Sequence, residues 1–114
     1  MKNDCLFCAI IAGEIPGARV YEDEVCYAFR DINPQAPTHI LVVPKEHIAS
    51  LAELDADNAS VAAHILLVCA RIAEQEGLDG GWRLVSNCGP DAGQTVHHLH
   101  FHILGGKRLE DRMA

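Results

Sequence analysis

The segment HLHFHIL, residues 98–104, alternates histidine with a large apolar residue along its first six positions. Successive side chains of a β-strand point to opposite faces of a sheet, so this pattern predicts a strand. Its three imidazoles then form a row on one face, while Leu99, Phe101 and Ile103 pack into the core on the other. A chain with this segment is therefore expected to contain a sheet that carries chemistry on one face.

The rest of the sequence predicts an α+β domain around that strand. Apolar residues recur at helical spacing in residues 5–13 and 60–77, and each of these predicted helices ends at a glycine. Further strands are predicted over residues 18–23, 24–31, 38–44 and 81–87. The order of helix, three strands, helix and two strands indicates a mostly antiparallel sheet.

Length and charge exclude several classes of protein. With 114 residues, the chain is expected to form a single domain over residues 1–114. The formal net charge of −7 opposes binding to a nucleic-acid backbone. The apolar run near the N-terminus is too short to span a bilayer and lacks the pattern of a signal peptide. We therefore expect a soluble cytoplasmic protein with neither nucleic-acid nor membrane partners.

Two functions fit the row of histidines, because imidazole near neutral pH can bind a metal or act on a substrate. The loop CGPDAGQT, residues 88–95, places backbone amides and the Thr95 hydroxyl shortly before the row, where they can hold a phosphate. A single histidine on a sheet is usually a half-buried polar residue without a function. We expect this of His64 and His97, but three histidines on one face indicate a site.

Cys5 and Cys8 have the C-x-x-C spacing that presents two thiolates to one tetrahedral metal ion. Such a half-site needs two more ligands, for which His47 and His98 are the candidates. The alternative is a pair of unligated thiols near the start of a helix. Cys26, Cys69 and Cys88 have no comparable spacing and are expected to be packing residues.

The segment HLHFHIL fits the H-x-H-x-H-x-x signature of the histidine-triad (HIT) superfamily. Two longer segments, DINPQAPTHILVVPKEHI and GQTVHHLHFHILGG, resemble those of its nucleotide-binding HINT branch, and the similarity extends over about residues 5–106, leaving 107–114 as a tail. The resemblance implies a HIT-like fold, a five-stranded sheet with two main helices. It also implies a homodimer in which two sheets join into ten strands.

The resemblance further implies how the histidines act. His100 would attack the α-phosphorus of a nucleoside monophosphate ester or amidate and form a nucleotidyl-histidine, which water then hydrolyses. Its other ring nitrogen would be held by a hydrogen bond to a backbone carbonyl near His98. His102 would contact the phosphate oxygens, and His39 would support the site as a fourth histidine. Residues expected to hold the phosphate and the leaving group are Asn87, Gly93, Gln94 and Thr95.

The same resemblance implies a nucleoside pocket and a zinc site. Asp31 would accept hydrogen bonds from the ribose hydroxyls. The base would be enclosed by apolar residues, each of which could equally belong to the core: Leu6, Phe7, Ile10, Ile15, Phe29 and Ile32. Many bacterial members with this C-x-x-C bind structural zinc, which implies the ligands Cys5, Cys8, His47 and His98.

The expected activity is hydrolysis of purine nucleoside phosphoramidates or related derivatives of AMP and GMP, with no cofactor needed for the chemistry. One alternative is a regulatory protein that binds nucleotides and turns them over incidentally. Another is a dinucleoside polyphosphate hydrolase. A third is a metalloenzyme that uses the histidine row as ligands.

Overall fold

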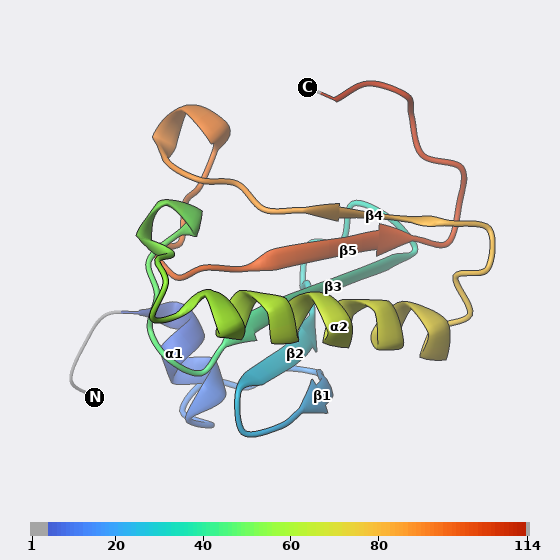
Figure 1. Ribbon diagram of the computed structural model, residues 1–114. Coiled ribbons are helices and arrows are strands. Elements are labelled where there is room, and N and C mark those ends of the chain that lie inside the picture. The colour runs from blue at the N-terminus through green and yellow to red at the C-terminus, as the bar shows by residue number, and fades with distance from the viewer. Residues whose placement is uncertain (1–4, 114) are drawn as a thin grey trace.

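The computed structural model describes residues 5–113 as a five-stranded sheet with one helix on each face (Figure 1). This confirms the predicted α+β class; residues 1–4 and 114 of the predicted domain lie outside the described residues. Two short 3-10 helices, Leu51–Glu53 and Pro90–Ala92, lie in loops. The main elements are α1 (Leu6–Ile11), β1 (Arg19–Glu22), β2 (Cys26–Arg30), β3 (Thr38–Pro44), α2 (Ala59–Gln75), β4 (Trp82–Val85) and β5 (Phe101–Gly105).

The sheet has the order β1-β2-β3-β5-β4, and each neighbouring pair is antiparallel. β3 lies at the centre and is buried from its second residue to its last, in keeping with its nearly continuous apolar sequence. Leu41 of β3 lies opposite Phe29 of β2 and His102 of β5. Since directly opposite residues share a face, this register puts the histidine row beside an apolar wall.

The long helix α2 covers one face of the sheet and forms the larger core (Figure 1). Its buried side chains include Ile65, Val68 and Ile72, which recur at the helical spacing predicted for this segment. Leu99 and Ile103 belong to the same cluster, as the alternation in the sequence predicted. Neither helix of residues 5–113 combines the length and apolarity needed to cross a membrane.

The short helix α1 packs against the opposite face and forms a second, smaller core. Phe7 and Ile10 of α1 contact a cluster that includes Phe29, Leu41 and Val43. Because α1 has only six residues, it covers only part of this face. The histidines lie on this same face, where His100 packs against Phe7 and His102 is half-buried.

The predicted strand over residues 98–104 is shorter in the structure, where β5 begins at Phe101. The preceding residues bond outside the regular ladder: the Leu99 amide donates to the Ile48 carbonyl, and the Ser86 hydroxyl donates to the His100 carbonyl. The alternation of side chains nevertheless continues through this segment, since Leu99 is in the core below α2.

α2 ends in a Schellman motif at the predicted glycine. The Gly77 amide donates to the Glu74 carbonyl and the Leu78 amide to the Ala73 carbonyl, with Gly77 at a φ of 73°. Leu78 then packs against the larger core, so the motif also sets the direction in which the chain leaves α2.

We predict that Gly77→Ala lowers the free energy of unfolding by about 1–2 kcal/mol, the cost of a left-handed conformation for a residue with a Cβ atom. No neighbouring atom lies within 4 Å of the added methyl group, so no clash contributes. Gly80→Ala is the matched control, because its methyl group also meets open space and its φ lies outside the left-handed region. Urea denaturation measures both variants, and equal losses would contradict the assignment.

Candidate active site and metal centre

A cavity of about 280 Å³ opens on the face of the sheet that α1 partly covers. Its lining contains ten of the residues predicted for the active site, from separate segments of the chain: Leu6, Phe7, Ile10, Ile15, Phe29, Asp31, Ile32, Thr95, His100 and His102. Leu41 and Val96 also line it and were not predicted. No pattern in the sequence indicated Leu41, because its place beside His102 depends on the register between β3 and β5.

The walls of the cavity expose apolar side chains to solvent. Ile32 is 99% exposed, Leu6 44% and Ile15 37%. Exposed apolar groups that gather around a hollow mark a binding surface more often than scattered ones do. The lining of this cavity therefore combines apolar side chains with the imidazoles of His100 and His102.

The tautomer of His100 follows from its backbone partner. Its Nδ1 lies 2.7 Å from the His98 carbonyl oxygen, which can only accept, so Nδ1 carries the proton. In the neutral ring, Nε2 is then left with a lone pair. His100 is buried beneath Phe7, whose ring centroid lies 5.0 Å away at 84°. The hydrogen bond expected at a backbone carbonyl near His98 is thus present.

His39 and His102 form a second imidazole arrangement. The Gln35 amide donates to His39 Nδ1 at 3.0 Å, which leaves the proton of the neutral ring on Nε2. His39 Nε2 lies 2.9 Å from His102 Nδ1 and donates to it, so the neutral His102 ring carries its proton on Nε2. Burial and the nearby rings of His100 and His39 lower the pKa of His102 to about 4.

Asp31 stands beside this pair. Its Oδ1 accepts the Asn33 amide at 2.8 Å, and its Oδ2 lies 3.4 Å from His39 Nε2. Burial lowers the pKa of His39, and the charge of Asp31 opposes that effect. The carboxylate thus lies next to the histidine pair and also lines the cavity.

Four of the residues predicted for the active site do not line this cavity: Asn87, Gly93, Gln94 and His39. His39 lies behind His102, as described above. The Gln94 amide group instead ties the loop together: its oxygen accepts the Gly89 amide, and its nitrogen donates to the carbonyls of Ala49 and Val96. Gln94 therefore positions the loop that carries Thr95.

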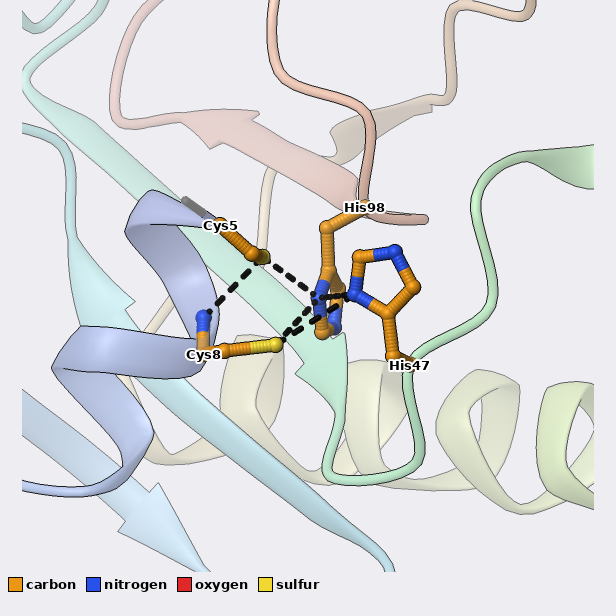
Figure 2. A group of neighbouring side chains, drawn as sticks. All are labelled: Cys5, Cys8, His47 and His98. Atoms are coloured by element: carbon orange, nitrogen blue, oxygen red, sulfur yellow. Dashed lines mark hydrogen bonds between the residues drawn. The ribbon is translucent and has the colours of Figure 1, made fainter. Parts of the chain in front are cut away.

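Cys5, Cys8, His47 and His98 converge from three segments (Figure 2). Their four ligand atoms lie within 4.8 Å of one another. His98 Nδ1 is 3.2 Å from Cys5 Sγ, 3.5 Å from Cys8 Sγ and 3.2 Å from His47 Nδ1, and Cys8 Sγ is 3.3 Å from His47 Nδ1. The sequence motif at the start of α1 thus meets both of the histidines predicted to complete it.

This cluster fits a zinc ion. Tetrahedral zinc with ordinary bond lengths holds sulfur and nitrogen ligands about 3.3–3.6 Å apart, close to the spacings found here. His98 Nε2 lies 2.8 Å from the Pro44 carbonyl oxygen and donates to it, which turns the lone pair of Nδ1 toward the two sulfurs. The sulfur of Cys5 also accepts the Cys8 amide at 3.2 Å. Bound zinc would join α1 to the sheet.

Two other groups of potential metal ligands lie close together because their members form hydrogen bonds to one another. The first is Asp31, His39 and His102. The 2.9 Å between the nitrogens of His39 and His102 is shorter than the edge of a zinc tetrahedron. Asp23, Cys26 and His64 also gather, but His64 Nε2 donates to Asp23 Oδ2 at 2.7 Å. Burial raises the pKa of the Cys26 thiol to about 12, which disfavours the thiolate that a metal requires.

Comparison with known proteins gave consistent matches. The family model described as HIT domain matches residues 12–109. The chain is 43% identical to the purine nucleoside phosphoramidase of Escherichia coli, over 100% of this chain and 97% of that protein. It is 47% identical to a 14 kDa zinc-binding protein of Zea mays, over 91% and 83%. A solved HIT family hydrolase from Clostridium thermocellum superimposes with a TM-score of 0.95 at 45% identity, over 100% and 99%.

The donor set predicts that protein purified without chelator retains about one zinc ion per chain. Removing the ion should destabilise the fold, because metal binding contributes to folding free energy. For a domain of this size, each kcal/mol lost lowers the melting temperature by roughly 4 °C. Elemental analysis and thermal unfolding, with and without chelator, measure both effects.

Cys8→Ser should reduce bound zinc, whereas Cys88→Ser, a half-buried cysteine outside the cluster, should not. Absence of zinc after reconstitution, or equal loss in both variants, would count against the site.

Proposed function

Since the chain belongs to the HIT domain family, we propose that it hydrolyses purine nucleoside phosphoramidates or related nucleotidyl compounds through a nucleotidyl-histidine at His100. The observation that carries the proposal is the cavity, which joins apolar walls to the free ring nitrogen of His100. The phosphoramidase activity named for the relative from Escherichia coli supports the substrate class.

The apolar walls of the cavity suit a purine base. Phe7 and Phe29 meet edge to face with centroids 5.5 Å apart, and aliphatic residues complete the walls. Asp31 lines the same cavity, with its Oδ2 3.4 Å from His39 Nε2, and its carboxylate can accept hydrogen bonds from ribose hydroxyls. A nucleoside bound in this way directs its 5′-phosphate toward His100 and Thr95.

In the first proposed step, His100 Nε2 attacks the α-phosphorus and the P–N bond breaks. The nitrogen of the leaving amine keeps the bonding electron pair and takes the Nε2 proton of a His102 ring that has first gained a second proton from solvent, so the ring returns to its neutral form. The pKa of about 4 leaves His102 neutral in the ligand-free protein, but an anionic phosphate beside the ring raises that value. The substrate phosphate therefore favours the protonated His102 ring, which is the form that donates to the leaving amine.

In the second step, water attacks the phosphorus and releases His100. The oxygen of water joins the nucleoside monophosphate, and the proton lost by water returns to His102. The backbone donor and acceptor bonds to His39 and His100 keep both reacting nitrogens available throughout. Two displacements at one imidazole replace a single difficult one.

We further propose that Cys5, Cys8, His47 and His98 hold a structural zinc ion. We also propose that two chains form a homodimer. The zinc-binding protein of Zea mays and the convergence of the four ligand atoms support the metal. The edge strand β4 and the exposed residues Leu66, Leu67 and Trp82 support pairing of two copies into a ten-stranded sheet. A cytoplasmic location stays a prediction from the sequence.

We predict that His100→Ala lowers turnover of adenosine phosphoramidate by a factor on the order of 10⁴ or more while leaving AMP affinity nearly unchanged. The change removes the nucleophile and keeps the cavity walls. His97→Ala is the matched control, because this neighbouring histidine is exposed and does not line the cavity.

Steady-state assays and calorimetric AMP titration measure the two properties. Turnover close to wild type in His100→Ala would remove this residue from its role. Tight AMP binding with negligible turnover in the wild type would favour a regulatory nucleotide-binding protein. Preference for dinucleoside polyphosphates in a parallel assay would favour that hydrolase class.

We predict that the wild type favours a ribonucleoside substrate over its 2′-deoxy analogue by about 1.5–3 kcal/mol in kcat/KM, the range for hydrogen bonds to a charged group. Asp31→Asn should reduce this preference, since the amide is uncharged. The ratio of kcat/KM for the two substrates is measured on both proteins. An unchanged ratio would show that Asp31 does not hold the ribose hydroxyls.

A further inference from the structure

We propose that Asp31 is also a positioning residue for the His39–His102 pair, so that one carboxylate serves both sugar binding and phosphate chemistry. The inference rests on the proposed function, because it assigns a second role within the same site. It predicts that loss of the carboxylate slows the chemical step even on a substrate that has no ribose hydroxyls.

The backbone places Asp31 beside His39. In the β2–β3 ladder Arg30 lies opposite Ile40, and the Asp31 amide donates to the His39 carbonyl at 3.0 Å, one residue beyond the end of β2. Directly opposite residues of antiparallel strands project their side chains to the same face. The pairing of Asp31 with His39 is therefore built into the ladder.

The carboxylate is held in one orientation. Its Oδ1 accepts the Asn33 amide at 2.8 Å, which leaves Oδ2 to face His39 Nε2 at 3.4 Å. The His39 side chain is only 4% exposed and that of Asp31 19%, so water screens their interaction weakly. At 3.4 Å the carboxylate acts mainly through its charge, because the nearer partner of Nε2 is His102 Nδ1 at 2.9 Å.

This charge matters when the pair becomes cationic. Burial disfavours a proton on His39 or His102, and the negative charge of Asp31 opposes that penalty at both rings. The proposed cycle requires His102 to hold an additional proton while it faces the phosphate. The carboxylate stabilises that state through its negative charge, which acts on both rings from a position 3.4 Å from His39 Nε2.

A ribose hydroxyl bonded to Asp31 shares the carboxylate with the pair. Sugar binding therefore changes the negative charge that His39 experiences. Through the histidine pair, it also changes how easily His102 holds the additional proton. If Asp31 served the sugar alone, its removal would have no effect on a dideoxy substrate. If it served only the turn, asparagine would replace it fully, because the amide oxygen also accepts the Asn33 amide.

The test compares Asp31→Asn with wild type on adenosine phosphoramidate and on its 2′,3′-dideoxy analogue. We expect kcat on the dideoxy substrate to fall at least about tenfold, the equivalent of one pKa unit at the pair, with little change in KM. Asp79→Asn, which removes an exposed carboxylate outside the cavity lining, should leave kcat unchanged. An unchanged kcat for Asp31→Asn on the dideoxy substrate would overturn the inference.

A measurement without turnover separates this inference from the proposed function. In the ¹⁵N spectrum of the ligand-free protein, Asp31→Asn should shift the ring nitrogens of His39 and His102 and leave those of His64 in place. In the wild type, AMP should move the His39 nitrogens more than dideoxy-AMP does. Unshifted His39 and His102 resonances in the variant would overturn the inference, even if the wild type hydrolyses phosphoramidates.

Discussion

The buried ring of His98 connects the two centres of this protein. Its Nδ1 faces the cysteine sulfurs, its Nε2 donates to the Pro44 carbonyl, and its own carbonyl oxygen accepts the proton of His100 Nδ1. A shift of His98 would therefore disturb both the proposed zinc site and the tautomer of His100. The backbone that carries His98 is irregular before β5, since the Leu99 amide donates to the Ile48 carbonyl instead of to a ladder partner.

The unequal coverage of the two faces creates the cavity. α2 covers the face on which Ile40 and Val42 of β3 are completely buried, whereas the six-residue helix α1 covers the other face only in part. The apolar residues Ile15 and Ile32 around the opening are consequently left exposed. The C-x-x-C at the start of α1 then has a second consequence, because a metal bound there would fix the helix that forms one wall.

Fixed backbone donors and acceptors determine the direction of the imidazole hydrogen bonds. The Gln35 amide orients His39, His39 orients His102, and the His98 carbonyl orients His100. No side chain with a freely rotating hydroxyl takes part in these three bonds. The site is therefore preorganised to present a lone pair on His100 and a donor on His102, which is the arrangement that the proposed reaction at phosphorus requires.

Local periodicity was sufficient to predict α2, the central strand and the face that carries the histidines, because these features depend on spacing along the chain. The sequence pattern also indicated the cysteine half-site. Only the tertiary structure decided that Gln94 ties a loop, that β5 begins at Phe101, and that Asp31 lies opposite His39. Those outcomes depend on strand register and loop closure, which bring together residues distant in sequence and which no local repeat encodes.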